Sequence, residues 1–302
     1  MSNRSAGAAV IIENFESYRS LLFSIAYRML GSASEADDIV QEAYLRYCTA
    51  PANDIHSLKA YLSTVVTHLC LDYLKSARVQ REQYIGSWLP EPVLTTDSNI
   101  RLFETAEQRE SITLAFLVLL EALNPLERAV FLLHEVFDYT YQEIAEMLGK
   151  SPANCRQLCH RAKEYIIERR QRFAPSREAQ LRLMGRFLAA CQEGDLQGLM
   201  DVLAHDVINW SDGGGKAVAA RRPINGAAAV AQFWLALSRK TPSDFSLTLE
   251  EVNDTPAFLL WIGDSLLSVV TFEVIGERIQ GFRNVLNPNK LAYILRQLQA
   301  RS

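Results

Sequence analysis

Six polar or basic side chains near the middle of the chain have the types that recognise DNA. They are Asn154, Arg156, Gln157, His160, Arg161 and Lys163. Amide, guanidinium and imidazole groups read base edges in the major groove, whereas basic side chains neutralise phosphates. We therefore predict the first four as base readers and the last two as phosphate contacts. From residue 150 to 177 the chain has eight Lys or Arg against only two Glu, and such local positive charge supplies much of a protein's affinity for DNA.

The surrounding residues predict a helix-turn-helix that would position these groups. Thr140 suits an N-cap with Glu143 as its capping-box partner, and Gly149 suits a left-handed helix end. The pair Ser151-Pro152 fits the start of a second helix, which no breaker interrupts before Arg169. The early residues of such a second helix lie in the major groove. The alternative is an ordinary helical hairpin with a solvated basic face.

Length, charge and cysteine content suit a multidomain protein in a reducing compartment. The chain has 302 residues, and one domain usually has roughly 100 to 150. A net charge of -4 means that contact with DNA must come from local patches. The five cysteines are scattered and odd in number, which fits free thiols. Cys155, Cys159 and His160 could suggest a metal or redox site, because residues at i and i+4 share a helix face. No second ligand cluster stands elsewhere in the sequence, and we expect no metal.

The beginning of the chain has no apolar run of signal-peptide length, and no later run reaches about 18 apolar residues. We therefore expect a cytoplasmic protein without a membrane partner.

Two faces separate on a helix predicted for residues 37–47, with Ser34 as its cap. One face is largely apolar and consists of Val40, Ala43, Tyr44 and Tyr47. The other is polar but includes one leucine, and consists of Asp38, Gln41, Glu42 and Leu45. A polar face with an apolar residue can bind a protein. A solvated face is the alternative.

A further helix is predicted for residues 57–81, with a basic end. Its core candidates are Leu58, Leu62, Val65, Leu69 and Leu74. Its other side chains include Tyr61, Tyr73, Lys75, Arg78 and Arg81. Aromatic rings stack on unpaired bases and basic groups screen phosphates, so this helix suits single-stranded nucleic acid.

In their order and separation these segments resemble a bacterial RNA polymerase sigma factor of the extracytoplasmic function (ECF) group. Residues 34–46 are similar to the polymerase-binding helix of that family, residues 58–78 to its promoter-melting helix, and residues 141–166 to the domain that reads the upstream promoter element. The resemblance implies two all-α domains, region 2 over residues 10–83 and region 4 over residues 106–174. A linker over residues 84–105 joins them.

The resemblance also implies partners and residue roles. A sigma factor has core RNA polymerase and promoter DNA as its partners, and the resemblance implies neither a cofactor nor a catalytic residue. The residues expected to face the polymerase clamp are Asp37, Asp38, Gln41, Glu42 and Leu45. Those expected to capture the melted -10 strand are Asn53, Asp54, Tyr61, Lys75 and Arg78. The six residues from Asn154 to Lys163 are expected to read the -35 element.

Roughly 125 residues follow Pro175, where typical members of the group end. Two helices and an extended segment come first, then a helix over residues 227–237. Strand patterns follow at residues 245–252, 257–262, 266–274 and 278–286. Helices followed by an antiparallel sheet indicate an α+β cone. This tail, residues 176–302, resembles the SnoaL-like or ketosteroid-isomerase-like fold, and the whole chain resembles the sigma subgroup that carries such a domain as a fused regulator.

Three short motifs support that closer resemblance. They are WLPEP at residues 88–92, DGGGK at residues 212–216 and NPNKL at residues 287–291. In the last motif the family usually has Asp where Asn289 stands. We expect the WLPEP segment to dock near the DGGGK turn and so fix the spacing of the two DNA-binding domains. The candidate regulatory residues are Trp88, Pro90, Asp212, Gly213, Gly214, Lys216, Asn287 and Lys290.

Other interpretations of these segments remain open. The triple glycine lacks the Ser or Thr of a phosphate-binding P-loop, since Ala217 follows Lys216. A tight turn that another part of the chain approaches is the better interpretation. The tail could instead be an enzyme or a small-molecule sensor, with His205, Asp206, Trp210, Asp212 and Trp234 as the nearest candidates for its pocket. A plain DNA-binding repressor would not need the polar face at residues 37–45.

Overall fold

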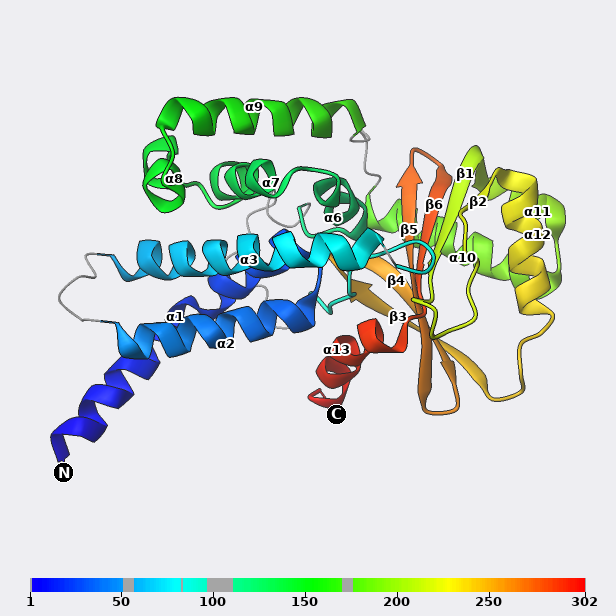
Figure 1. The fold of residues 1–302 in the computed structure, drawn as a ribbon. Coiled ribbons are helices and arrows are strands. Elements are labelled where there is room, and N and C mark those ends of the chain that lie inside the picture. Colours follow the sequence, from blue (N-terminus) through cyan, green and yellow to red (C-terminus); the bar gives the residue numbers. More distant parts are fainter. Residues whose placement is uncertain (1, 51–56, 83, 97–110, 170–175, 302) are drawn as a thin grey trace. The chain divides into compact units, whose positions relative to one another are not determined.

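The computed structural model describes residues 2–50, 57–82, 84–96, 111–169 and 176–301 (Figure 1). It has two compact units. The helical unit consists of Met1–Gln80, Asp97–Ile112 and Phe116–Arg169. The tail unit consists of Arg81–Thr96, Thr113–Ala115 and Arg170–Ser302, so the described residues of the linker belong to the same unit as the tail.

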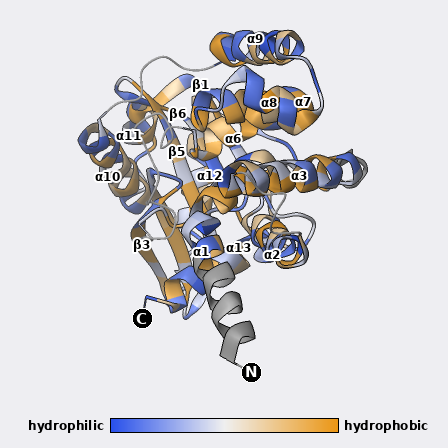
Figure 2. Ribbon diagram, turned by 90° about the vertical axis from the view of Figure 1, so that its left-hand side faces the viewer, coloured by the Kyte–Doolittle hydropathy of each residue, from blue (hydrophilic) through white to orange (hydrophobic). Residues whose placement is uncertain are grey.

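Helices make up the first unit, as the sequence predicts. They are α1 (Ser2–Leu30), α2 (Ala33–Thr49), α3 (Leu58–Glu82), α6 (Leu114–Glu121), α7 (Pro125–Phe131), the π-helix η2 (Leu132–Val136), α8 (Tyr141–Leu148) and α9 (Pro152–Arg169). Figure 2 shows hydrophilic and hydrophobic residues alternating along α3 and α9, as expected of helices with one buried side.

The N-cap of helix α2 lies two residues before the predicted cap at Ser34. Gly31 adopts a left-handed φ of 65° after α1, and the Ser32 side chain accepts a hydrogen bond from the Glu35 backbone N–H. Ser32 is therefore the N-cap, and Ser34 lies in the first turn of the helix. The prediction of Ser34 was wrong because two serines compete for the same function, and the left-handed glycine favours the nearer one.

The buried side of α3 differs from the predicted one. Leu62 and Leu74 are buried as expected, but Leu58, Val65 and Leu69 are only half-buried. Fully buried positions of α3 include Val66, Cys70 and the polar pair Ser63 and Thr67. The two hydroxyls can be buried because Thr67 donates to the Ser63 carbonyl and Ser63 accepts from Tyr139. The leucine-based pattern missed this polar side.

The tail is an α+β domain with a six-stranded mixed sheet. Its helices are α10 (Arg177–Glu193), α11 (Leu196–Val202), α12 (Ala227–Ser238) and α13 (Pro288–Gln299). Its strands are β1 (Leu203–Asp212), β2 (Ile224–Asn225), β3 (Phe245–Val252), β4 (Thr255–Ile262), β5 (Ser265–Ile275) and β6 (Arg278–Val285). The strand order is β2-β1-β6-β5-β4-β3, and β1 and β6 are the parallel pair. The four predicted strand patterns correspond to β3 to β6.

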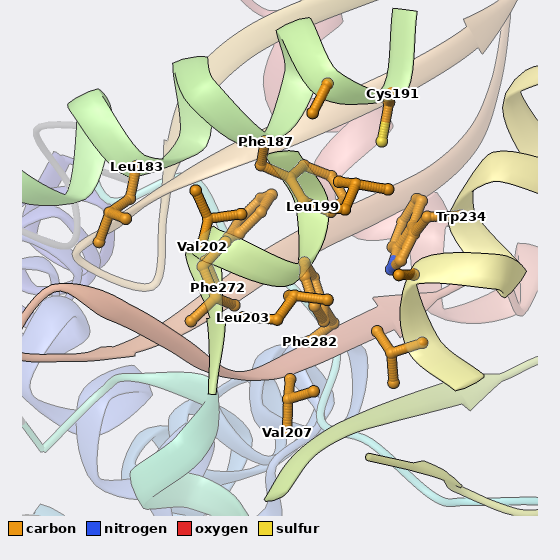
Figure 3. Close-up of a cluster of buried hydrophobic side chains, with 14 of the residues drawn as sticks. Leu183, Phe187, Cys191, Leu199, Val202, Leu203, Val207, Trp234, Phe272 and Phe282 are labelled. Atoms are coloured by element: carbon orange, nitrogen blue, oxygen red, sulfur yellow. The ribbon is translucent and has the colours of Figure 1, made fainter. Parts of the chain in front are cut away.

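Both faces of this sheet are covered. On one face Phe272 and Phe282 pack with Phe187 of α10 and Trp234 of α12 (Figure 3), and the Phe187 and Trp234 ring centroids are 5.3 Å apart. On the other face α13 packs against the sheet (Figure 1), and residues such as Val269 are fully buried. Because side chains alternate along a strand, an apolar sequence such as that of β5 can serve both faces.

Candidate functional sites

The predicted helix-turn-helix is present as α8, the turn at Gly149 and α9. The Thr140 hydroxyl accepts from the Glu143 N–H at 3.2 Å, and a Glu143 carboxylate oxygen accepts from the Thr140 N–H at 2.7 Å. This capping box fixes where α8 begins. Gly149 ends the helix with a φ of 61°, and Pro152 occupies the first turn of α9. Local residue chemistry therefore determines the geometry of the motif.

The predicted base readers share the exposed side of α9. Asn154, Arg156, Gln157 and His160 are all exposed. The opposite side is buried and consists of Cys155, Leu158, Cys159, Ala162 and Ile166. Within the helical unit, the structure thus presents these four polar groups together on one helix.

The two predicted phosphate contacts have carboxylate partners. Arg161 Nε lies 3.1 Å from Glu127 Oε1, and Lys163 Nζ lies 2.8 Å from Glu135 Oε2. Arg161 is exposed and Lys163 is half-buried. A phosphate must compete with these carboxylates, so their contact with DNA remains a prediction.

The two cysteines of α9 have a structural role. Cys155 and Cys159 are both fully buried, and burial raises the pKa of both thiols. A thiol that stays protonated is a poor metal ligand. Among the described residues no group of three His, Cys, Asp or Glu could hold a metal ion.

Helix α2 presents the predicted polymerase-binding side chains on its outer side. Asp37, Asp38 and Gln41 are exposed, Leu45 is 53% exposed, and Glu42 is half-buried and pairs with Arg46. On the inner side Val40 and Ala43 are fully buried, and the rings of Tyr44 and Tyr47 pack against Phe15 at 5.0 and 6.3 Å. An exposed leucine among acidic and amide groups suits a protein-binding surface.

The predicted -10 residues are only partly described. Asn53 and Asp54 lie outside the described residues, as does the side chain of Arg78. Tyr61 and Lys75 lie on α3, where Tyr61 is half-buried and Lys75 is exposed and bound to Asp72 at 2.7 Å. The structure therefore places these two residues on one helix without testing the capture of a DNA strand.

Polar contacts that the sequence did not predict join the two halves of the helical unit. Arg128 of α7 donates to the Met29 carbonyl at 2.5 Å, and Tyr139 donates to Ser63 at 2.8 Å. His68 of α3 hydrogen-bonds the Met147 carbonyl at 2.7 Å. Arg128 is 3% exposed, and burial lowers its pKa to about 10, which still leaves it charged at neutral pH. No local pattern marks an arginine whose partner lies 99 residues away.

In the tail unit, Asp212 is the centre of the contact between the linker and the DGGGK turn. It ends β1, its side chain is fully buried, and its carboxylate accepts three hydrogen bonds. The donors are Tyr84 OH at 2.5 Å, the Leu89 backbone N–H at 2.8 Å and Lys290 Nζ at 2.7 Å. The predicted docking of the linker segment near this turn is thus present in the structure.

Lys290 binds the linker from the other side. Its ammonium group donates to the Leu89 carbonyl at 2.5 Å and lies 4.3 Å from the centroid of the Trp88 ring and 4.8 Å from that of Tyr84. A cation is attracted to the faces of aromatic rings, most strongly where water is excluded. Lys290 and Asp212 therefore satisfy both backbone groups of Leu89 and neutralise each other's buried charge.

Asn287 and Gly214 complete this contact. Asn287 caps α13 by accepting from the Asn289 N–H at 3.1 Å, and it donates to Tyr84 OH at 2.9 Å. Gly214 has a φ of 56°, and a Cβ there would lie 2.1 Å from Asn287 Nδ2. A Cβ added at Gly213 would similarly lie only 2.5 Å from the Ala217 carbonyl oxygen. The glycines therefore permit close approach, as predicted.

The remaining motif residues lie around the contact. Pro90 is buried and Trp88 is half-buried, whereas Lys216 and Asn289 are exposed. The replacement of the usual Asp by Asn289 thus affects an exposed position in the first turn of α13. We call the contacts of Asp212, Asn287 and Lys290 with residues 84–89 the linker dock.

A second set of contacts holds the linker at Val93 and Leu94, four and five residues after Leu89. Val93 exchanges two hydrogen bonds with Asn253, through the Asn253 side-chain oxygen at 3.1 Å and its backbone N–H at 3.0 Å. The Gln297 amide binds both backbone groups of Leu94, at 2.8 and 3.3 Å. Asn253 lies in a hairpin turn with a φ of 53° and is fully buried. The sequence marks this turn but not its partner.

The rival pocket residues are not assembled at one place in the tail. His205 and Asp206 are exposed on β1, and Asp212 belongs to the linker dock. Trp210 packs against Arg283 at 4.9 Å, whereas Trp234 lies in the core on the opposite face of the sheet (Figure 3). A hydrogen bond with Gln280 lowers the pKa of Asp206, which makes that carboxylate a weaker base. These five residues therefore do not line one common pocket, which the enzyme or sensor interpretation would need.

Among the helices of the described ranges, none has the length and apolar character needed to cross a membrane.

Comparison with known proteins relates both units to transcription factors. The family model "Sigma-70 region 2" matches residues 15–79, and "Sigma-70, region 4" matches residues 113–166. The ECF RNA polymerase sigma factor SigJ of Mycobacterium tuberculosis is 38% identical over 230 residues, which cover 76% of this chain and 73% of SigJ. The probable ECF RNA polymerase sigma factor SigI of the same species is 34% identical and covers 92% of this chain and 93% of SigI.

The likeness extends to the whole fold. The crystal structure of SigJ superposes with a TM-score of 0.74 and 32% identity, covering 93% of this chain and 98% of that one. The match therefore includes the helical unit and the tail.

Proposed function

This chain belongs to the ECF sigma factors of RNA polymerase, and we propose that its tail sets promoter output by holding the linker between regions 2 and 4. Sigma factors bind core RNA polymerase and direct it to promoters, where transcription starts. They are not enzymes, and no residue of this chain is assigned covalent chemistry. The cytoplasm, where RNA polymerase works, is the proposed location.

Three surfaces divide this work in the proposal. The outer side of α2, from Asp37 to Leu45, binds the polymerase clamp. Helix α3 and the loop before it capture the melted -10 strand, and the exposed side of α9 reads the -35 element. The exposure of the α2 and α9 side chains supports these roles.

The observation that carries the regulatory proposal is the buried carboxylate of Asp212 at the linker dock. Its hydrogen bonds and its pairing with Lys290 hold the backbone of Leu89, 123 residues away in the chain. Two weak DNA contacts cooperate only when their separation matches the promoter, because the second contact is then effectively intramolecular. Holding the linker against the tail therefore changes how well regions 2 and 4 bind their two promoter elements at the same time.

The test uses two glycine substitutions in the full chain. Gly214→Ala places a methyl group against Asn287 in the linker dock. Gly276→Ala is the matched control, because Gly276 has nearly the same φ, 57°, and no atom within 4 Å of the added Cβ. Both variants suffer the same backbone strain, but only the first one disturbs the dock.

Run-off transcription with bacterial core polymerase is then measured for both variants, together with core binding and thermal unfolding. The proposal predicts altered output per bound core for Gly214→Ala relative to Gly276→Ala. Equal output from two folded variants would overturn the regulatory role of the dock. If the wild-type chain does not bind core polymerase, its assignment as a sigma factor that directs this polymerase would be overturned.

A further inference from the structure

One carboxylate of the tail, that of Glu251 on β3, contacts two segments that are far apart in the chain. Its side chain is only 5% exposed. One carboxylate oxygen pairs with Arg177, and the other accepts from the Thr95 hydroxyl at 3.4 Å. The Glu251 backbone carbonyl also accepts from the Thr95 N–H at 3.2 Å. All three residues belong to the tail unit.

The positions of these partners in the sequence give the contact its significance. Thr95 is the second-last described residue of the linker, which continues to residue 105, where region 4 follows. Arg177 is the first residue of α10, after the chain has left region 4 through residues 170–175. The segments that enter and leave region 4 are thus both anchored at Glu251.

Arg177 does not stabilise α10 from its position in the first turn of that helix. A positive side chain at a helix N-terminus opposes the helix dipole. Ser176 already caps α10, by accepting from the Ala179 N–H at 3.3 Å. The pairing with Glu251 therefore explains why a basic residue stands where α10 begins, and the side chain of Arg177, 63% exposed, can be replaced without disturbing the core.

Thr95 is held by more contacts than Arg177. Thr95 makes further bonds, since its hydroxyl accepts from the Asp254 N–H at 2.9 Å, and the neighbouring Leu94 is held by Gln297. Among the contacts that the structure describes for Arg177, Glu251 is the charged partner. Loss of this carboxylate would therefore release the exit segment more readily than the entry segment.

We propose that Glu251 is a positioning residue that fixes the two segments which enter and leave region 4, here called its entry and exit tethers. By fixing them it limits the promoter spacings on which the factor works. This inference rests on the proposed function, because it assumes that the tail controls the reach of region 4. The proposed function says that the tail sets promoter output. The inference adds that the tail does so by limiting the tolerated separation between the -10 and -35 elements.

The length of the exit tether shows how much further region 4 could reach if the contact with Glu251 were lost. From Arg169 to Arg177 the chain can span about 27 Å at most. The first buried side chain of α10 is Leu183, six residues further on. Fraying up to that residue would lengthen the tether by about 20 Å at full extension, or about six base pairs at 3.4 Å each.

The experiment is run-off transcription from a promoter series whose spacer varies by single base pairs about the optimum. Glu251→Gln keeps the shape of the side chain but removes its charge, and Arg177→Gln breaks the same pair from its exposed side. Glu277→Gln, at the exposed turn between β5 and β6, is the matched control. Arg177→Lys should restore most of the wild-type profile, because it keeps the charge.

The proposal predicts that Glu251→Gln and Arg177→Gln raise output at off-optimum spacers relative to the optimum by about threefold, the effect of one weak ion pair. Core binding should stay unchanged. The double variant should equal the stronger single variant, since both remove one contact. An unchanged spacer profile in folded Arg177→Gln would overturn the role of Glu251. The regulatory proposal would then still stand if Gly214→Ala alters output, and would fail if it does not.

Discussion

Replacing Asp212 by Asn tests the charge of the linker dock while keeping its shape. Oδ1 of Asp212 accepts from Tyr84, and Oδ2 accepts from both Leu89 and Lys290. An asparagine has one oxygen, so its NH2 group must face either the two donors on Oδ2 or the Tyr84 hydroxyl, which Asn287 already contacts. At least one charge-assisted hydrogen bond is lost in either orientation.

The structure gives the size of this loss. The Lys290 side chain is 10% exposed, and breaking a buried ion pair from one side usually costs about 3 to 5 kcal/mol. Lys290 keeps the Leu89 carbonyl and two aromatic rings as partners, so we expect the lower end of the range. A cost of about 3 kcal/mol raises the population of released linker by about two powers of ten.

Amide hydrogen exchange at Leu89 measures that population directly. Asp212→Asn should accelerate exchange there by about two powers of ten, whereas Asp206→Asn, an exposed carboxylate of the same strand, should not. Adding Lys290→Met should recover part of the loss, because it removes the unpaired charge. An exchange rate at Leu89 within about twofold of wild type in Asp212→Asn would refute the reasoning.

Further predictions concern other parts of the chain. Burial, and then the hydrogen bond to Asp212, raises the pKa of Tyr84. Docking of the linker should therefore weaken as the pH rises above about 10, where a released tyrosine ionises. In hydrogen-exchange experiments across that range, Tyr84→Phe should lose this pH dependence. Thr140→Ala should destabilise the helical unit by about 1 kcal/mol in urea unfolding, and Thr140→Ser should not. Arg128→Met should cost about 2 kcal/mol in the same assay because the Met29 carbonyl loses its donor, and an unchanged midpoint would contradict this. Gln157→Ala should lower discrimination at one -35 base pair by about 1 to 3 kcal/mol in binding assays on mutated promoters, with little change for unrelated DNA.

Local signals made parts of this structure predictable. The capping box at Thr140 and the left-handed Gly149 are determined by neighbouring residues, so the start and end of α8 were predicted correctly. Strand patterns in the sequence similarly predicted β3 to β6. Where two local signals compete, as at Ser32 and Ser34, the prediction of the cap failed.

Long-range polar contacts had no such signal. The motifs indicated that the linker and the DGGGK turn meet, but not that one carboxylate binds Tyr84, Leu89 and Lys290 together. Gln297 binds Leu94 across 203 residues, and no spacing in the sequence relates them. Partners of this kind depend on which surfaces the fold brings together, and the sequence alone does not show that.

The central claim is that the docked linker controls promoter output, and the most direct measurement is run-off transcription per bound core polymerase with Gly214→Ala and Gly276→Ala on one promoter. The account predicts that output changes only in Gly214→Ala, the variant in which exchange at Leu89 accelerates. Accelerated exchange at Leu89 with unchanged output would contradict it.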